Sequence, residues 1–343
     1  MEKRLKNIFK NKKILVTGGT GCIGSEIVKA LLNYEPEVVR IFSNDEDSTF
    51  RMIQEIGKGD NRRFLIGDVR DIERLNLAME EIDIVYHAAA LKHVPLCEYN
   101  PFEAIKTNVL GTQNVINVAL THGTDKVINI STDKAVNPTN TMGATKLLTE
   151  KLIIDANFYK GKSKTDFSCV RFGNVSFSRG SVIPLFEEQI KRKKMITLTD
   201  KNMTRFMMSI SNTIDLVFKA TLMAKGGEIF VLKMPAVNLG DLADVAINFY
   251  SKKYGFEPKK IEKKIIGPRS GEKMFEELMT ETEAKKAFET NDMLIIPPHV
   301  ELPNVKFKLL DYHGAFHSKL KRYTSKDVKH LSKKEIEKML FKL

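Results

Sequence analysis

The chain has 343 residues, of which 42% are hydrophobic and 29% charged, and its formal net charge is +12. This apolar fraction excludes a disordered chain, and no apolar run reaches the roughly 18–20 residues that a membrane span needs. Cys22, Cys97 and Cys169 are too few and too widely spaced for a disulfide framework or a zinc site, which fits a reducing cytoplasm.

Strands and helices alternate along the first half of the chain. Lys13–Thr17 is a short apolar run that stops at glycine, as a buried parallel strand does, and helical spacing follows over Ile23–Leu32. The alternation continues through predicted strands at Val38–Phe42, Arg63–Ile66, Ile82–His87, Lys126–Ser131 and Phe167–Phe172, and through helices at Asp45–Ile56, Asn100–Leu120 and Met142–Ala156. This order predicts an α/β fold with a Rossmann-type, doubly wound parallel sheet.

The pattern changes after about Asn174, where the segments shorten and prolines become frequent. We therefore expect a Rossmann domain over residues 12–175 and a smaller C-terminal domain over 176–343. Glu228–Leu232 reads as a strand again, so the chain is expected to return to the first domain near 228–232.

A glycine-rich turn, TGGTGCIG over residues 17–24, follows the first predicted strand and opens the first helix. Gly18 permits a tight turn, Gly21 lets the backbone approach a pyrophosphate, and Gly24 lets the helix pack against the sheet. Unpaired N–H groups and the dipole favour anions at this helix N-terminus. The turn within a βαβ unit predicts a dinucleotide site, to which Thr20, Cys22 and Ile23 also belong.

The residues at the carboxyl ends of the next strands indicate whether NADP or NAD binds. Ser43 and Asn44 are neutral donors that tolerate a 2′-phosphate, and Arg51 lies beyond them, which favours NADP over NAD. Asp45 would instead hold the 2′-OH of NAD, or would cap the following helix. Further residues expected at the cofactor, on the adenine or the nicotinamide side, are Asp68, Val69, Ala88, Ala89, Ala90 and Asn108; for Asp68 a simple turn residue is the second interpretation.

A second signal is Ser131-Thr132-Asp133-Lys134, followed by Met142-Gly143-Ala144-Thr145-Lys146. The first group ends the fifth strand, and α/β sheets bind ligands at the carboxyl ends of their strands. Alone, Asp133 and Lys134 would be a surface ion pair worth about 0–1 kcal/mol. Their position beside the expected nicotinamide favours a catalytic role.

The motifs TGGTGCIG, HAAALKHVP, NVLGT, STDKAV, MGATK, RFGNV and PRSGEKMFEE stand in the order seen in extended short-chain dehydrogenase/reductases. More narrowly, the chain resembles the nucleotide-sugar 4,6-dehydratases that act on UDP-N-acetylglucosamine. The resemblance runs from about Lys12 to the final helix. STDKAV and LKHVP are specific to that branch, whereas TGxxGxxG is not.

The resemblance implies a catalytic set in which Thr132 binds the sugar 4-OH and Lys146 holds the nicotinamide ribose. The tyrosine of the wider superfamily is replaced by Met142, whose thioether cannot take a hydroxyl proton. Some members of the branch also carry methionine there, so the first proton acceptor stays unassigned.

The implied reaction oxidises sugar C4 with a tightly bound, recycled NADP or NAD, eliminates water across C5 and C6, and returns hydride to C6. Lys134, with a pKa lowered by burial and by the neighbouring cation, would remove the C5 proton. Asp133, with a raised pKa, would protonate O6. Retention or inversion at C5 is left open.

The C-terminal domain would bind the UDP-sugar. Arg205 and Arg269 resemble the family's diphosphate-binding positions, which suit the bidentate guanidinium fork, and Glu272 would meet the ribose. Asn174 and a loop at Ser181–Leu185, including Val182 and Pro184, would cover the uracil. Lys92 and His93 would lie near the acetamido group or C6, or would be solvated loop residues.

Two other functions share these features: a UDP-hexose 4-epimerase, and a catalytically inactive NAD(P)-binding scaffold or sensor. We expect no metal, no nucleic-acid partner and a homo-oligomer, dimer or hexamer, as in the relatives. Residues 1–13 and 318–343 carry +5 and +6 of the net charge, so the basic balance belongs to the two ends. These ends would be solvated tails or would dock on an anionic surface. Residues 1–13 lack the apolar segment of a secretory signal.

Overall fold

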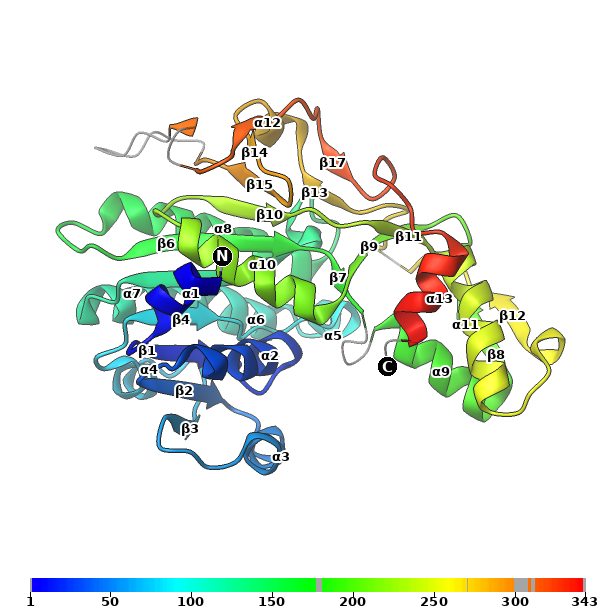
Figure 1. The fold of residues 1–343 in the computed structure, drawn as a ribbon, viewed down its shortest axis with the longest axis horizontal. Coiled ribbons are helices and arrows are strands. Elements are labelled where there is room, and N and C mark those ends of the chain that lie inside the picture. Colours follow the sequence, from blue (N-terminus) through cyan, green and yellow to red (C-terminus); the bar gives the residue numbers. More distant parts are fainter. Residues whose placement is uncertain (1, 177–180, 270, 299–307, 310–311, 342–343) are drawn as a thin grey trace.

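A computed structural model describes residues 2–176, 181–269, 271–298, 308–309 and 312–341. These residues build a ten-stranded sheet in the order β16-β14-β15-β10-β6-β5-β4-β1-β2-β3 (Figure 1). From β3 to β10 every neighbouring pair is parallel, which confirms the predicted Rossmann-type α/β fold. The strands are β1 Lys13–Thr17, β2 Val38–Ser43, β3 Arg62–Ile66, β4 Ile84–His87, β5 Lys126–Thr132, β6 Asp166–Phe172, β10 Ile229–Leu232, β14 Phe288–Glu289, β15 Met293–Ile296 and β16 Phe316–His317.

Helices cover both faces of this sheet (Figure 1). One face packs against α1 (Glu2–Phe9), α2 (Cys22–Leu31) and α10 (Ile210–Met223), and the other against α4 (Ile72–Met79), α7 (Gly111–His122) and α8 (Thr141–Tyr159). Beside β2 and β3 lies α3 (Glu46–Ile56). Across the described ranges, no helix combines the length and apolarity that crossing a membrane requires.

The helix predicted over Asn100–Leu120 differs in its middle. The chain forms α6 (Pro101–Ala104), then a π-helical segment over Ile105–Leu110, and then α7. A π-helical turn takes in one extra residue and turns the following side chains, and such turns are frequent at functional sites. Asn108 lies within this segment and is buried.

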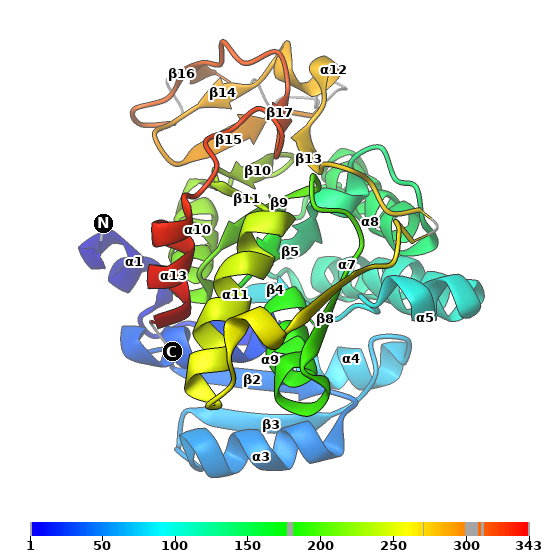
Figure 2. The same cartoon turned by 90° about the vertical axis from the view of Figure 1, so that its right-hand side faces the viewer.

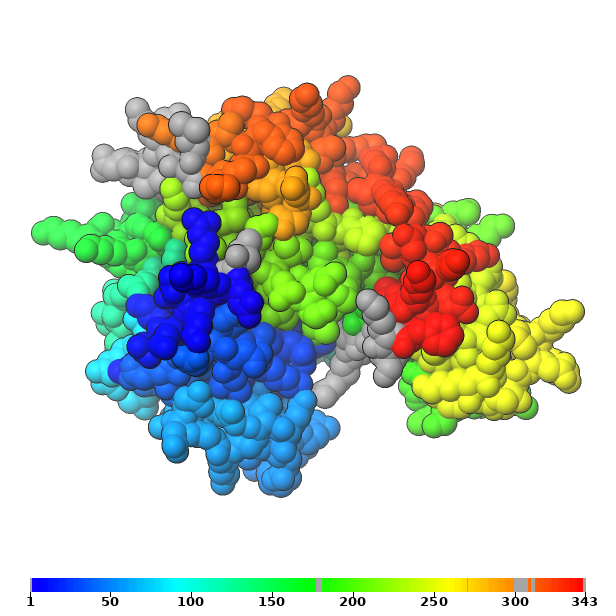
Figure 3. Space-filling model, in the orientation of Figure 1, coloured from blue at the N-terminus to red at the C-terminus, as the bar shows by residue number. Residues whose placement is uncertain are grey.

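The basic N-terminus is a packed helix, so a solvated tail is the wrong description of it. Leu5 and Phe9 of α1 are buried, and the Phe9 ring lies 4.9 Å from that of Phe218 on α10. On the outer side, Lys6 and Lys10 pair with Glu35. Figure 3 shows α1 and the C-terminal helix on well-separated parts of the surface. Docking of these ends on an anionic surface stays a prediction.

The second half forms a lobe beside the carboxyl ends of the parallel strands (Figure 2). It contains α9 (Val182–Lys193), α11 (Leu239–Lys253) and α13 (Lys333–Phe341). The expected loop at Ser181–Leu185 is therefore wrong, because Val182 begins a helix. The small sheets and short helices of this half are β7 Asn174–Val175, β9 Thr204–Met208 and β11 Ala236–Asn238; β8 Met195–Leu198 and β12 Glu262–Ile265; β13 Glu277–Met279 and β17 Tyr323–Thr324; and α12 Glu281–Ala284.

More of the second half enters the large sheet than the sequence indicated. The strand expected at Glu228–Leu232 is β10, parallel to β6. Beyond it β15, β14 and β16 continue the sheet in antiparallel order, which no pattern in the sequence predicted.

Candidate functional site

The glycine-rich turn between β1 and α2 lies against the end of β4. Gly18 has a φ of +63°, and a Cβ there would lie 2.8 Å from the Ala89 Cα. A Cβ on Gly24 would lie 2.2 Å from the Gly18 carbonyl oxygen. The backbone amide of Gly21 donates to the same oxygen at 2.9 Å. Side chains are thus excluded from the helix N-terminus, which leaves the close approach that a pyrophosphate requires.

Gly24→Ala is expected to abolish dinucleotide binding, because its methyl group would displace the Gly18 carbonyl and reshape the turn. Titration of the variant with NADPH and NADH by fluorescence measures this. Gly59→Ala is a suitable control, since the nearest atoms to a Cβ there belong to the Arg62 side chain, at 3.2 Å, and lie away from the turn. Unchanged affinity in Gly24→Ala would contradict the assignment of this turn.

A cavity of about 240 Å³ opens in front of the turn, at the carboxyl edge of β1 to β4. It brings together most of the predicted cofactor residues: Gly18, Thr20, Gly21, Ser43, Asn44, Asp45, Asp68, Val69, Ala88, Ala89 and Ala90. Cys22, Ile23 and Gly24 lie behind it in the first turn of α2. Phe42, Ser48, Gly67, Leu91 and Thr107 also line the cavity and were not predicted. Shape and chemistry fit a dinucleotide.

Hydrogen bonds tie the strand tips around this cavity together. The hydroxyls of Thr20 and Ser43 are 2.6 Å apart, and the Asn44 amide donates to Asp68 at 3.1 Å. Asp45 accepts from the Ser48 amide at 2.9 Å, so it caps α3, which was one of its two predicted roles. Burial would raise the pKa of Asp68, but its bonds to Arg70 outweigh burial and lower it.

Asn108 does not line this cavity itself, but it binds the backbone of Leu91, which does. Its side chain accepts from the Leu91 amide at 2.8 Å and donates to the Leu91 carbonyl at 3.1 Å and to the Thr145 hydroxyl at 2.9 Å. The amide thereby fixes the loop after β4 to α8. Next to it, burial lowers the pKa of His87 to about 3, so this histidine is a neutral hydrogen-bonding partner of Thr17 and Thr112.

Thr132, Asp133 and Lys134 form one hydrogen-bonded group at the end of β5. The Thr132 hydroxyl donates to Asp133 Oδ1 at 2.8 Å, and Lys134 Nζ donates to the same oxygen at 2.9 Å. The Asp133 side chain is fully buried, whereas that of Lys134 is 27% exposed. The carboxylate is therefore inside the protein, and the lysine is partly exposed at the end of β5.

The expected lowering of the Lys134 pKa is wrong for this structure. Burial lowers it, but the charges of Asp133 and Glu276 outweigh burial and raise it. Glu276, just before β13, was not singled out in the sequence, although it lies within PRSGEKMFEE. It is buried, and its Oε1 lies 3.7 Å from Arg205 Nε.

Lys146 lies on α8 beneath the end of β5, where its Nζ donates to the Ile130 carbonyl at 2.7 Å. Burial lowers its pKa to about 8. Met142, one turn earlier, packs in an apolar cluster with Cys97 and Ala104.

The residues predicted to bind the substrate differ in burial: some are inside the protein and others are exposed. Arg205 on β9 is buried and pairs with Glu272 at 3.2 Å, close to Glu276. The side chain of Arg269 is exposed, and its amide donates to Glu272 at 3.0 Å. Lys92 and His93 are exposed on the loop after β4. Asn174 lies on β7 with an Oδ1 that is buried and lacks a hydrogen-bond partner in the described ranges, while Val182 and Pro184 are half-buried in α9.

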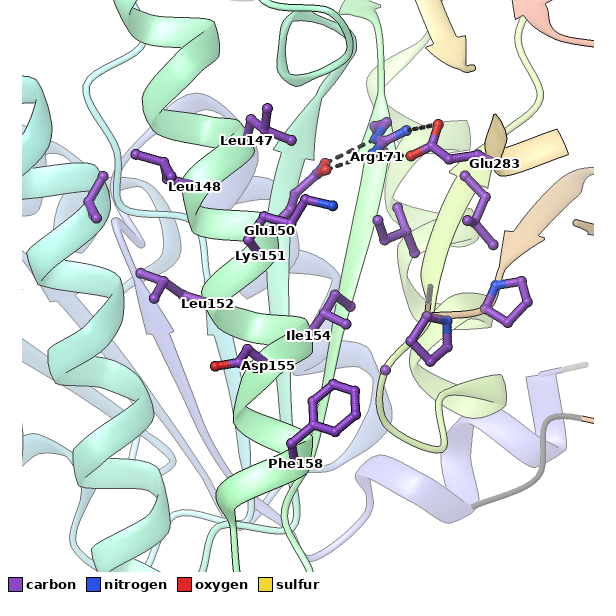
Figure 4. Close-up of a pocket in the computed structure, with 16 residues that line it drawn as sticks. Leu147, Leu148, Glu150, Lys151, Leu152, Ile154, Asp155, Phe158, Arg171 and Glu283 are labelled. Carbon is purple, nitrogen blue, oxygen red and sulfur yellow. Dashed lines mark hydrogen bonds and ion pairs between the residues drawn. The ribbon is translucent and has the colours of Figure 1, made fainter. Parts of the chain in front are cut away.

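A second cavity, of about 330 Å³, lies away from this group, between α8, β6 and the end of β15 (Figure 4). Leucines of α8 line its apolar wall, and Arg171, Glu150 and Glu283 lie on its other side. None of the predicted site residues lines it.

Residues 14–298 match the family model described as "Polysaccharide biosynthesis protein". An uncharacterised membrane protein of Methanocaldococcus jannaschii is 54% identical over 99% of this chain and 98% of its own length. A UDP-N-acetylglucosamine 4,6-dehydratase (inverting) of Campylobacter jejuni is 43% identical over 86% of this chain and 85% of its own. A UDP-glucose 4-epimerase of Rickettsia rickettsii is 39% identical over 98% and 97%.

Among solved structures, the X-ray structure of Pen from Bacillus thuringiensis superposes with a TM-score of 0.89. It is 46% identical and covers 97% of this chain and 98% of its own. The similarity therefore includes the C-terminal lobe as well as the Rossmann sheet.

Proposed function

This chain belongs to the polysaccharide biosynthesis protein family, within the extended short-chain dehydrogenase/reductases, and we propose that it is a UDP-N-acetylglucosamine 4,6-dehydratase. The observation that carries the proposal is the Thr132-Asp133-Lys134 group, hydrogen-bonded at the carboxyl end of β5, beside a cavity that fits a dinucleotide. The similarity to the Campylobacter dehydratase supports it. The product would be a UDP-2-acetamido-2,6-dideoxy-4-hexulose for surface glycan synthesis.

When bound, the nicotinamide would supply reversible hydride transfer to the sugar. Gly18 and Gly21 would admit its pyrophosphate, and Lys146 would hold its ribose. Thr132 would orient the sugar 4-OH, Lys134 would remove the proton from C5, and Asp133 would deliver a proton to O6 as water leaves. Arg205, Arg269 and Glu272 would hold the UDP moiety, with Arg205 exchanging its glutamate partners for phosphate oxygens.

Incubation with UDP-N-acetylglucosamine in D₂O tests this function. We expect a product that has lost one water and carries deuterium at C5, seen by mass spectrometry and proton NMR. The proton couplings would also give the C5 configuration. If no UDP-sugar is turned over, the result would contradict an enzymatic function and would favour a catalytically inactive NAD(P)-binding scaffold or sensor.

A UDP-hexose 4-epimerase is the second candidate, favoured by the similarity to the Rickettsia epimerase over nearly the whole chain. Epimerases share the oxidation at C4 but do not eliminate water. An epimerase carries out chemistry at C4 only and does not need a charged pair for proton transfer at C5 and O6. The presence of Asp133 and Lys134 therefore favours the dehydratase. An isomer of unchanged mass in the same experiment would decide for the epimerase.

We propose NADP as the preferred cofactor. Arg51 donates to the Ser48 hydroxyl at 3.1 Å, and Ser48 lines the cavity, so the guanidinium lies one residue behind its wall. Asp45 is occupied as the cap of α3. Arg51→Ala should weaken NADPH binding by about 10- to 100-fold and leave NADH binding nearly unchanged, because a charge-assisted hydrogen bond contributes about 1.5–3 kcal/mol. Tighter binding of NADH than NADPH by the unaltered protein would contradict the proposal.

We also propose a homo-oligomer. Large apolar side chains are exposed on neighbouring elements: Tyr99 of α5 (Val94–Tyr99), Phe102 of α6, Leu110, and Leu148 and Tyr159 of α8. Apolar patches of this kind mark association surfaces. Light scattering should give a multiple of 39.0 kDa for the protein, and Leu148→Lys should lower that mass. A monomer in the unaltered protein would contradict it.

A further inference from the structure

We propose that the far end of the C-terminal lobe docks on the surface of a membrane that carries anionic lipids. This surface, which we call the basic tip, consists of residues 191–194 and 252–266. They form the last residues of α9, those of α11, a 3₁₀ turn over Pro258–Lys260, and β12 with the residue after it. The basic tip lies at the end of the molecule away from the ten-stranded sheet (Figure 1). The proposal does not depend on the proposed dehydratase function.

The basic tip concentrates positive charge. Its nineteen residues include ten Lys or Arg and two Glu, and all ten basic residues are exposed. Residues 14–317 are nearly neutral as a whole, so the average charge of that long stretch hides the concentration. Because the two segments are separate in sequence, only folding brings their charges together.

Specific contacts join the two segments into one surface. The Glu262 amide at the start of β12 donates to the Lys194 carbonyl at the end of α9, at 3.2 Å. The Lys253 side chain at the end of α11 pairs with Glu187 of α9 at 2.8 Å. The Lys194 ammonium lies 5.0 Å from the centre of the Phe256 ring. The ends of both helices and the strand therefore lie side by side.

The acidic residues in this region do not cancel the charge, because most already have a basic partner. The ion pairs join Glu187 to Lys253 at 2.8 Å, Glu188 to Arg192 at 3.4 Å, Glu257 to Lys260 at 2.9 Å, and Asp244 to Lys263 at 2.7 Å. Four exposed lysines form no ion pair with a residue that the structure describes: Lys193, Lys252, Lys259 and Lys264. These ammonium groups are available to anions outside the protein.

Apolar side chains distinguish the basic tip from an ordinary solvated surface. Lysines at helix C-termini stabilise the helix dipole, and lysines on an edge strand prevent pairing with other sheets. Neither role explains Ile265 and Ile266, which follow two of these lysines and are 57% and 47% exposed. Cations around exposed apolar residues suit a bilayer surface, which offers both anionic headgroups and hydrocarbon. A nucleic acid offers phosphates but no hydrocarbon.

Flotation of the full chain with vesicles tests the proposal. We expect the protein to float with phosphatidylcholine vesicles that contain phosphatidylglycerol, and not with vesicles of phosphatidylcholine alone. Binding should weaken as salt is raised above about 0.1 M, where the screening length is about 10 Å. Failure to float with the anionic vesicles, or equal flotation with both kinds, would overturn the proposal.

A charge-reversal variant locates the surface. The double variant Lys193→Glu/Lys264→Glu should weaken vesicle binding by at least about 25-fold, because each lysine near an anionic surface contributes about fivefold. Lys3→Glu/Arg4→Glu on α1 is the matched control, since both residues are exposed and the net charge changes equally. It should bind vesicles like the unaltered protein. Equal losses in the two variants, or a loss in the control alone, would overturn the proposal. Unchanged thermal unfolding would show that both variants fold.

An apolar variant separates a membrane from other anionic partners. Ile265→Ser/Ile266→Ser keeps every charge and should weaken vesicle binding by at least about tenfold, since burial of one such side chain contributes that much. Unchanged vesicle binding would mean that the basic tip recognises charge alone, which would contradict docking on lipid. Tighter binding to a short DNA duplex than to the vesicles, lost in Lys193→Glu/Lys264→Glu, would overturn the proposal in favour of a nucleic-acid partner.

Discussion

Lys134→Ala should abolish dehydration, lowering kcat by about 10²–10⁴-fold, while leaving NADPH binding intact. The reason lies in the position of the amine. It is the cation bonded to the buried Asp133, its side chain is 27% exposed, and it lies outside the lining of the dinucleotide cavity. Loss of the amine removes the base without disturbing the glycine-rich turn.

Measurements of kcat for water loss, and of C5 deuterium incorporation, follow this effect. Lys126→Ala is the matched control, because Lys126 is at the other end of the same strand, β5, and its side chain is 25% exposed. It should keep nearly full activity. Lys134→Arg separates the effect of the charge from that of proton transfer, since a guanidinium keeps the positive charge but does not lose its proton near neutral pH. Full activity of Lys134→Ala would remove this residue from the mechanism.

Arg171→Ala should lower the free energy of unfolding by about 3–5 kcal/mol, the range for removing one partner of a buried ion pair. Arg171 on β6 is buried, and its guanidinium bonds to Glu150 at 2.6 and 3.0 Å and to Glu283 at 3.1 and 3.2 Å (Figure 4). It also donates to the Leu278 carbonyl at 2.9 Å. Without it, two carboxylates stay buried beside each other, and α8 loses its connection to α12.

Urea denaturation measures this change. Arg192→Ala is the control, because its pair with Glu188 on α9 is exposed at the surface and is worth at most about 1 kcal/mol.

The pH dependence of the free energy of unfolding tests the same ion pairs. Burial raises the pKa of Glu283, but the Arg171 charge outweighs burial and lowers it, so this stabilisation is present at neutral pH and is lost as pH falls through the folded pKa. The difference between the two proteins should therefore shrink on acidification. A loss below about 1 kcal/mol at pH 7 would contradict the role of the triad.

Local sequence patterns determined the parallel strands at the core of the fold and the edge of the sheet at which the candidate site lies. The strand at Lys13–Thr17 was predicted with its observed bounds, because apolar runs and glycines act over a few residues. The glycine-rich turn and the residues at the strand ends could be placed for a general reason. Parallel strands bring their carboxyl ends to one edge, so a residue at a strand's end is also at the site.

Elements that have no recognisable pattern in the local sequence could not be predicted. Strands β14 and β16 have two residues each, too few for any periodicity, and they form by pairing with edges that distant segments supply, β14 with β15 and β16 with β14. The N-terminal residues are rich in lysine, yet they form a helix whose Leu5 and Phe9 are buried against the rest of the protein. Composition cannot show that a buried partner such as Phe218 exists.

The charge states at the site were likewise decided by tertiary structure. The sequence placed Asp133 and Lys134 together, and from that pair alone a lowered lysine pKa was expected. The folded chain adds Glu276 and Arg205, distant in sequence, and the two carboxylates reverse the shift. A pKa depends on every charge within several ångströms, and packing of distant segments, not adjacency along the chain, determines which charges those are.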